Sequence, residues 1–313
     1  MKQYDAIVIG TGQSGPGMAS TLAAQGKRIA IAEGYRFGGS CVNYGCRPTK
    51  TLIASARAAH MARRGADFGV EIDNFSINWS RVRERVVGII TNTSAEIEQW
   101  LRDEEQFDVY PVYASFEGKH GDNYQVRMGD EIVEAPLIFL NTGTRARMPN
   151  VEGIESVKAL DSEGMLHVDE IPQHLIILGG SYIGLEMGQA FRRFGSQVTI
   201  IETSDCVIHR EDQDIQDEVH RFLTEEGIKV HTNSRLYKAE PTDDGGVSVT
   251  IHDEADGQDY TIEGTHWLNA IGRIPNTDML NLGSVGVETD QRGYVVVDEY
   301  LRTTAPGIYA LGD

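Results

Sequence analysis

Apolar and polar positions alternate along the chain in blocks that predict short buried strands joined by helices. Residues 6–9 form a continuous apolar run typical of a buried strand, and a glycine-rich turn and a helix-compatible stretch over 17–25 follow. A second strand is predicted over 28–32, and it ends at the acidic residue Glu33. This order of strand, turn, helix and strand predicts a βαβ unit with parallel strands.

The same order of elements recurs in the second half of the chain. A strand is predicted over 175–178, a glycine-rich turn follows, a helix runs to Phe194, and the next strand ends at Glu202. The spacing from the first glycine of the turn to the acid is identical in the two copies, Gly10 to Glu33 and Gly179 to Glu202. A repeat of both spacing and element order predicts two domains of the dinucleotide-binding, Rossmann-like type.

The turns carry the chemistry that a dinucleotide requires. The first reads G-x-G-x-x-G with glycines at Gly10, Gly12 and Gly15, and the second has Gly179 and Gly184 with Ser181 at the middle position. Backbone N–H groups and the positive end of the following helix suit a pyrophosphate, and the acid after the next strand suits a ribose hydroxyl. Two βαβ units that bind nothing are the alternative.

The nucleotide preference of the second domain follows from Glu202. The segment after it, TSDCVIHR, places no arginine in the next few positions to meet a 2′-phosphate, and the carboxylate would repel one. NADH is therefore favoured over NADPH.

The remaining segments complete a map of the chain. Residues 1–147 form a first nucleotide domain with a helical insertion (51–65 and 80–105) and a β-rich piece (108–140), and residues 150–270 form the second. Residues 275–313 have no glycine fingerprint and are expected to add strands to the first domain. The predicted class is thus α/β, with one nucleotide domain inserted into the other.

Composition and charge argue against some classes of binding partner. The net charge of −19 over 313 residues argues against nucleic acid and anionic membranes, and no apolar run has the length of a membrane span. The N-terminus does not resemble a signal peptide, so a cytoplasmic location is expected. The chain's 3 cysteines do not make a disulfide scaffold.

Two cysteines, Cys41 and Cys46, lie close together in GGSCVNYGCRPTK. Positions five apart in a regular α-helix have Cα atoms about 8.6 Å apart, whereas a disulfide needs roughly 4.4–6.8 Å. Gly45 and Pro48 predict a break in the helix between the cysteines and a new helix near Cys46, whose positive end would stabilise a thiolate. We interpret the pair as a redox-active dithiol; two inert thiols and a metal pair are the alternatives, although C-x4-C is not usual zinc spacing.

The motifs together resemble a known family. Two dinucleotide fingerprints, CVNYGCRPTK after the first, YIGLE in the second and a terminal IYALGD are similar to the flavin-dependent pyridine nucleotide–disulfide oxidoreductases. That family includes dihydrolipoamide dehydrogenase, glutathione reductase and mercuric reductase, and the segment NYGCRPTKTLIASARAAH looks most like the mercuric-reductase-like branch. The resemblance spans essentially the whole chain.

The resemblance implies specific roles for residues of this chain. Cys46 would face the flavin, Cys41 would attack the substrate, and Lys50 would pair with Glu186 beside the flavin. The implied FAD contacts are Gly10, Gly12, Gly15, Glu33, Gly39, Ser40, Lys50, Ala114, Thr142, Gly143 and Asp313. The implied NADH contacts are Gly179, Ser181, Tyr182, Ile183, Gly184, Glu202 and Gly272, with Tyr182 as an aromatic gate.

The resemblance also implies the reaction and its partners. Hydride would pass from NADH to FAD, and electrons would pass on to the Cys41–Cys46 disulfide and to a small-molecule disulfide, protein disulfide or metal ion, with no metal held by the protein itself. Members of the family continue past the terminal G-D into a dimerisation domain, so a truncated form with impaired turnover, of a protein that is otherwise a homodimer, is expected. A flavin-binding redox sensor or scaffold, and a diaphorase or oxidase with idle cysteines, are the alternatives.

Overall fold

A computed structural model describes residues 1–313, which form two units. The first unit contains Met1–Cys46, Ile89–Arg145 and Arg273–Asp313, and the second contains Arg47–Gly88 and Ala146–Gly272. Both units are built on a parallel sheet with helices, which confirms the predicted α/β class.

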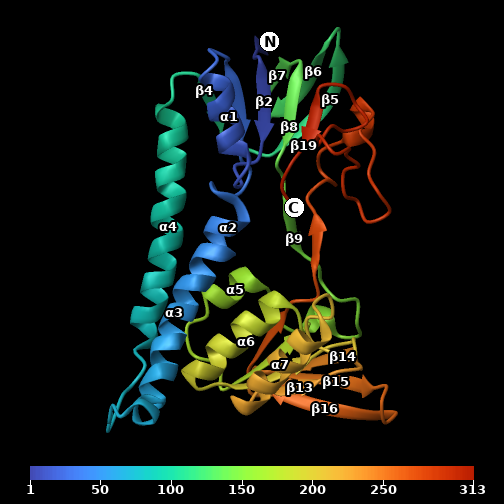
Figure 1. Cartoon of the computed structure of the whole chain (residues 1–313). Helices are drawn as coiled ribbons and strands as arrows, with labels where there is room; N and C mark the ends of the chain where they lie inside the picture. The colour runs from blue at the N-terminus through green and yellow to red at the C-terminus, as the bar shows by residue number, and fades with distance from the viewer. The chain divides into compact units, whose positions relative to one another are not determined.

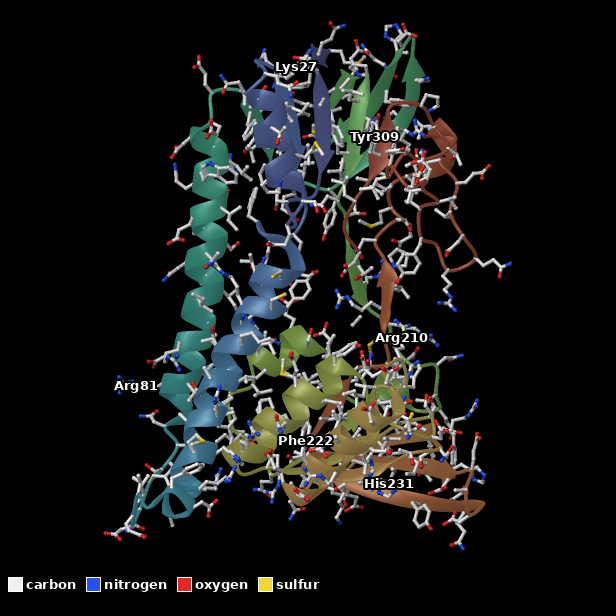
Figure 2. All side chains as sticks on the ribbon, in the orientation of Figure 1. Lys27, Arg81, Arg210, Phe222, His231 and Tyr309 are labelled. Carbon is white, nitrogen blue, oxygen red and sulfur yellow. The ribbon has the colours of Figure 1, made fainter.

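The first unit is built on a five-stranded parallel sheet in the order β19-β8-β2-β3-β4. Figure 1 shows β2, β8 and β19 side by side, with helix α1 (Gly15–Ala23) beside them. The tail therefore adds a strand to this sheet, as predicted, and Tyr309 on that strand, labelled in Figure 2, stacks on Phe139 with ring centroids 5.3 Å apart. The strands are β2 Ala6–Ile9, β3 Ile29–Ala32, β4 Phe107–Tyr110, β8 Leu137–Leu140 and β19 Ile308–Ala310.

Both faces of this sheet are buried, which explains the continuous apolar runs. Along β2, Ala6 and Val8 pack in a cluster with Ala19 of α1, whereas Ile7 and Ile9 pack in a second cluster with side chains of a four-stranded sheet. That second sheet has the order β1-β7-β6-β5. Its strands are β1 Lys2–Gln3, β5 Ala114–His120, β6 Asn123–Met128 and β7 Glu131–Ala135, and the 3₁₀ helix η3 spans Leu282–Val285.

The second unit repeats this plan with the sheet order β10-β17-β11-β12-β13. Ile176 packs in a cluster with Val249 of a three-stranded antiparallel sheet, β14-β15-β16, while Ile177 lies against Gly188 of helix α6. The main-sheet strands are β10 Ala159–Leu160, β11 His174–Leu178, β12 Gln197–Ile201, β13 Lys229–His231 and β17 His266–Asn269. The others are β14 Ser234–Pro241, β15 Val247–Asp253 and β16 Gln258–Gly264.

The helices and the linking strands account for most of the remaining chain. The two strands at the crossings between the units, β9 (Thr144–Ala146) and β18 (Arg273–Pro275), pair with each other. No helix combines the length and the apolar character needed to cross a membrane. The helices are α2 Gly39–Asn43, α3 Cys46–Arg63, α4 Trp79–Asp103, α5 Ser162–Leu166, α6 Tyr182–Phe194 and α7 Gln213–Glu225, with η1 Gly65–Phe68 and η2 Ile154–Ser156.

The unit boundaries differ from the predicted domain boundaries at residues 47–88. These residues, expected in the first nucleotide domain, group with the second unit. The reason is visible at Trp79, which begins α4: its ring lies 5.7 Å from Phe191 and 5.5 Å from Phe194 of α6, and its Nε1 donates to the carbonyl of Val168 at 3.2 Å. This aromatic packing joins the start of α4 to α6.

Candidate functional site

The first glycine turn is built by close backbone contacts that only glycine permits. Gly10 has φ +101°, and a Cβ there would lie 2.1 Å from the carbonyl oxygen of Asn141. A Cβ on Gly15 would lie 2.3 Å from the carbonyl oxygen of Gly10, and a Cβ on Gly39 would lie 2.7 Å from the Cα of Gly12. The turn and Gly39 thus form a tight cradle of backbone at the N-terminus of α1, which has no side-chain cap.

Glu33 closes one side of this cradle. It follows β3, and its carboxylate accepts hydrogen bonds from the Thr11 backbone N at 3.0 Å, the Thr11 hydroxyl at 2.7 Å and the Tyr35 backbone N at 2.9 Å. The Thr11 hydroxyl in turn accepts from the Gly38 backbone N at 3.1 Å. The carboxylate is therefore held at the edge of the turn, where the sequence predicted a ribose contact. The sequence did not single out Thr11, which is 1% exposed and links the acid to the glycines before α2.

The second turn has the same construction. Gly179 has φ +110°, and a Cβ on Gly184 would lie 2.1 Å from the carbonyl oxygen of Gly179. Glu202 accepts from the backbone N of Gly180 at 2.6 Å and of Ser204 at 2.8 Å, which matches the contact of Glu33 with Thr11. Ser181 precedes α6 in an extended conformation and makes no side-chain cap, so the first N–H groups of α6 have no side-chain partner there.

Tyr182 and Ile183 form the first turn of α6. Tyr182 is 55% exposed, and its hydroxyl donates to the carboxylate of Glu211. This hydrogen bond raises the pKa of the Tyr182 phenol above its usual value of 10.0. The side chain that the resemblance identifies as a gate is thus held by an acid just before α7.

The two cysteines lie on either side of a break between two helices. Cys41 is half-buried in α2, and Cys46 is exposed at the start of α3. Tyr44 leaves the helical region with φ −149°, and a Cβ on Gly45 would lie 2.9 Å from the Ser40 carbonyl oxygen and 3.3 Å from the Cα of Cys41. The predicted break is therefore present, and Gly45 lets the start of α3 approach the backbone of Cys41.

Lys50 and Glu186 meet in the second unit. The Lys50 ammonium on α3 forms an ion pair and hydrogen bond with the Glu186 carboxylate on α6, and the two side chains are 60% and 39% exposed. The sequence predicted this pair from the resemblance, and the structure brings the two residues together. The role of the pair beside a flavin stays a prediction.

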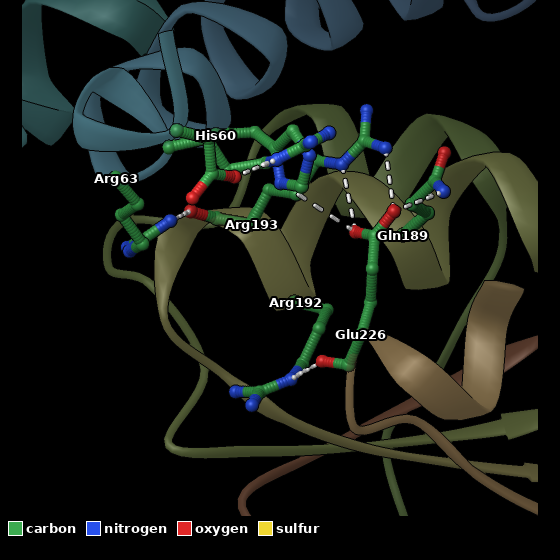
Figure 3. A network of polar contacts seen from close by, with 8 residues as sticks. His60, Arg63, Gln189, Arg192, Arg193 and Glu226 are labelled. Atoms are coloured by element: carbon green, nitrogen blue, oxygen red, sulfur yellow. Dashed lines mark hydrogen bonds and ion pairs between the residues drawn. The ribbon is translucent and has the colours of Figure 1, made fainter. Parts of the chain in front are cut away.

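A polar network fixes the other end of α3 on α6 (Figure 3). Arg193 donates to Glu226, which follows α7, from Nε at 2.8 Å and from Nη2 at 2.6 Å, and Gln189 donates to the same carboxylate at 2.9 Å. On α3, Arg63 donates to the backbone oxygen of Arg193, and His60 Nδ1 lies 4.0 Å from the Glu226 carboxylate. Together with the Lys50–Glu186 pair, these contacts hold α3 and α6 along each other. The sequence did not predict this network.

The remaining predicted residues lie at strand ends or on turns. Ala114 is buried at the start of β5, and Asp313 is exposed at the end of the chain. Thr142 and Gly143 follow β8 and are held by Asn276: its side-chain amide donates to the Thr142 carbonyl at 2.9 Å and its backbone N to the Gly143 carbonyl at 3.0 Å. Gly272 has φ +119° in open space after β17.

A second buried residue of the first cradle, besides Thr11, was not predicted either. Asn141 follows β8, is 7% exposed, and its Nδ2 has no hydrogen-bond partner. The only sequence feature that could have pointed to it is its place at the end of a strand, next to the predicted contacts Thr142 and Gly143.

Comparison with known proteins agrees with this geometry. The pyridine nucleotide-disulphide oxidoreductase family matches residues 4–313. The chain belongs to this family. Members of this family use a flavin and a pyridine nucleotide.

Several family members are similar over this chain. Dihydrolipoyl dehydrogenase of Cupriavidus necator is 32% identical and covers 100% of this chain, which spans 67% of that protein. Mercuric reductase of Staphylococcus aureus is 31% identical over 99% of this chain and 55% of its own length. The probable pyridine nucleotide-disulfide oxidoreductase RclA of Escherichia coli is 34% identical, over 100% of this chain and 66% of its own length.

A solved structure of a family member has the same fold. The Cu(II) complex of the HOCl-induced flavoprotein disulfide reductase RclA from Escherichia coli superposes with a TM-score of 0.86 at 32% identity, over 100% of this chain and 66% of that one. The chain thus spans between about half and two-thirds of the length of these relatives.

Proposed function

We propose that this chain binds FAD at the first glycine turn and NADH at the second, and that it reduces a disulfide formed by Cys41 and Cys46. The observation that carries the proposal is the position of the cysteine pair. Cys41 lies on α2, and the first residue of that helix, Gly39, packs against Gly12 of the first turn. Cys41, Cys46 and the first glycine turn therefore lie in the same unit.

The first turn fits a flavin dinucleotide. Gly10, Gly12, Gly15 and Gly39 carry no side chains of their own, so a diphosphate could approach the backbone N–H groups at the start of α1. Glu33, fixed by Thr11, would accept from the adenosine ribose. When bound, FAD would take a hydride from the nicotinamide and supply two electrons to the disulfide.

The cysteine pair would complete the reduction with balanced electrons and protons. Converting the disulfide into one thiol and one thiolate takes two electrons and one proton, which is what a hydride from NADH supplies, and water supplies a second proton only if the thiolate is protonated. Cys46 lies at the N-terminus of α3, whose helix dipole favours negative charge there. Cys46 would therefore hold the thiolate on the flavin side, and Cys41 would react with the substrate.

Lys50 and Glu186 would balance charge beside the flavin. A reduced flavin carries negative charge, which the Lys50 ammonium would stabilise. While the flavin is oxidised, Glu186 would balance the positive charge of that ammonium. Because both residues lie in the second unit, on α3 and α6, their pairing does not depend on how the two units are arranged.

NADH fits the second turn better than NADPH does. Both carboxylate oxygens of Glu202 are held by backbone N–H groups, of Gly180 and Ser204, so the acid is fixed next to the turn. A fixed carboxylate would accept from the ribose 2′-hydroxyl and repel a 2′-phosphate.

The electron acceptor of the whole protein is proposed to be a disulfide or a metal ion. The names of its relatives, dihydrolipoyl dehydrogenase, mercuric reductase and flavoprotein disulfide reductase, support both substrate classes. The homodimer and the cytoplasmic location expected from the sequence stay predictions.

Anaerobic thiol titration tests the proposal. The FAD-loaded chain is oxidised, and its thiols are counted before and after one equivalent of NADH. We expect two additional thiols in the wild type and none in Cys41→Ser or Cys46→Ser. Cys206→Ser is the control and should still gain two. Bleaching of the flavin with no gain of thiols would contradict the proposal and indicate a diaphorase or oxidase instead.

A further inference from the structure

Asn141 lies inside the first glycine cradle rather than beside it. Its backbone N donates to the carbonyl of Ile9 at 2.8 Å, which fixes the residue at the end of β8. Its Nδ2 lies only 3.1 Å and 2.8 Å from the positions that a Cβ would take on Gly12 and Gly15. Its Oδ1 lies 2.8 Å from the position of a Cβ on Gly312. Three glycines thus make room for this side chain.

The amide nitrogen of Asn141 is a buried donor without an acceptor. The residue is 7% exposed, and Nδ2 makes no hydrogen bond within the protein. Nearly all buried polar groups in proteins are paired, because a buried donor without a partner costs stability. A donor kept in this state at the N-terminus of a helix indicates a partner that the protein itself does not supply.

The second glycine turn shows that the fold does not require an asparagine here. Ala270 occupies the equivalent position: its backbone N donates to Leu178 at 2.7 Å, as Asn141 does to Ile9. A Cβ on Gly179 would meet the Ala270 carbonyl oxygen at 2.5 Å, as one on Gly10 would meet that of Asn141. The same turn is therefore built around a methyl group in one unit and around a carboxamide in the other.

We propose that the side-chain amide of Asn141 is a ligand of the diphosphate of the flavin nucleotide, an inference that rests on the proposed function of the first turn. Diphosphate oxygens are anionic acceptors, and hydrogen bonds to charged groups are stronger than those between neutral groups. The amide adds a donor to the backbone N–H groups at the start of α1 without adding a charge to the cradle. Asn141 distinguishes the flavin turn from the NADH turn.

Binding to the flavin-free chain tests this inference, with FAD and ADP titrated separately by calorimetry. Asn141→Ala copies Ala270, and we expect it to weaken binding of both ligands roughly ten- to a hundredfold, since the lost hydrogen bond has a charged acceptor. Asn269→Ala is the matched control: Asn269 is also buried, but its Nδ2 donates to the Arg147 carbonyl in the second unit at 2.7 Å. It should change the affinity for FAD less than twofold.

A second variant separates ligand binding from folding. Asn141→Asp keeps the shape of the side chain and replaces the donor with a carboxylate, so it should weaken FAD and ADP more than alanine does. The thermal midpoint of the flavin-free Asn141→Ala chain should stay close to that of the wild type, because no internal hydrogen bond is lost at Nδ2.

The outcomes distinguish this inference from the proposed function. If the wild type binds FAD and both Asn141 variants bind FAD and ADP equally well, the inference is wrong and the proposed function stands. If the wild type takes up no FAD, both are wrong.

Discussion

The guanidinium of Arg193 donates two hydrogen bonds to the carboxylate of Glu226, from Nε at 2.8 Å and from Nη2 at 2.6 Å. Both side chains are 17% exposed. Burial raises the pKa of the Glu226 carboxyl, but the hydrogen bonds and charge of Arg193 outweigh it and hold the pKa below its usual value. Because Glu226 lies 4.0 Å from His60 and Arg63 donates to the Arg193 backbone, this pair connects α6 and α7 to the helix that carries Lys50.

We expect Arg193→Lys to lower the free energy of unfolding by about 1–3 kcal/mol, because a lysine cannot make the two parallel bonds and leaves a half-buried carboxylate incompletely paired. Urea unfolding followed by circular dichroism measures the change. Arg221→Lys is the matched control: Arg221 also donates two hydrogen bonds to one carboxylate, that of Glu218, but the two side chains are 54% and 58% exposed. That solvent-exposed pair should contribute far less to stability, because water screens it. Equal losses in the two variants would contradict a special role for Arg193.

The second unit should lose stability as the pH falls below about 7. Burial lowers the pKa of four of its histidines below the usual 6.5, and for His60 the charge of Arg193 lowers it further. The unfolded chain then binds protons near pH 6.5 where the folded chain does not, so acid favours unfolding. The four residues are His60, His174, His231 and His266.

Thermal unfolding at pH 7.5 and pH 5.5 checks this dependence. The midpoint should fall at the lower pH, and the fall should be smaller in His174→Gln, which cannot take up a proton. His174 Nε2 lies 2.9 Å from the Thr199 hydroxyl, so glutamine can keep a polar contact there. A change at His209, which is exposed, serves as the control and should leave the fall unchanged. A midpoint independent of pH across this range would show that the buried histidines do not control stability.

The parts of the site that the sequence predicted are those built by local backbone. A glycine turn between a strand and a helix depends on neighbouring residues, so Gly10, Gly179 and the break at Gly45 follow from the order of residues alone. The pairing of Lys50 with Glu186 came only from resemblance to the family, because nothing local relates two charges so far apart in the chain.

The parts that the sequence missed depend on packing between distant elements. In the sequence, Arg193 in a predicted helix and Glu226 look like ordinary surface charges, and only the structure shows that they pair. Trp79 falls within the chain segment that the sequence assigns to the first domain, whereas its packing on Phe191 groups it with the second unit. Asn141 has no motif, and only its buried, unpaired amide reveals it.

Gly45→Ala should make the Cys41–Cys46 disulfide easier to reduce. The new Cβ would lie 2.9 Å from the Ser40 carbonyl oxygen and 3.3 Å from the Cα of Cys41, so the start of α3 must move away from α2. Since a disulfide tolerates only a narrow range of geometry, we expect a roughly tenfold smaller ratio of disulfide to dithiol, and so a smaller disulfide fraction, at a given glutathione redox poise. Alkylation and mass spectrometry across a series of glutathione buffers give that fraction.

Gly17→Ala is the control for this change. Gly17 lies in α1 of the same unit, and a Cβ there would meet nothing within 4 Å. It should leave the disulfide fraction unchanged and stabilise the helix by up to about 1 kcal/mol. A disulfide fraction in Gly45→Ala equal to that of the wild type would show that the close approach at Gly45 does not govern the pair.

Glu202→Gln should change the choice between NADH and NADPH. The wild-type carboxylate accepts from two backbone N–H groups, of Gly180 and Ser204, and offers a full negative charge to the ribose edge. The amide removes the charge that repels a 2′-phosphate and gives a weaker acceptor for a ribose hydroxyl. We therefore expect the ratio of NADH to NADPH efficiencies in flavin reduction to fall roughly ten- to a hundredfold. Stopped-flow absorbance of the FAD-loaded chain measures both rates.

The repeat itself supplies the control. Glu33 occupies the equivalent position of the first turn and accepts from Thr11 as Glu202 accepts from Gly180. If the two turns have the proposed ligands, Glu33→Gln should weaken FAD binding and leave the NADH to NADPH ratio as it is in the wild type, because the charge near the nicotinamide nucleotide is intact. The opposite pattern, a changed ratio in Glu33→Gln and an unchanged one in Glu202→Gln, would show that the nucleotides are assigned to the wrong turns.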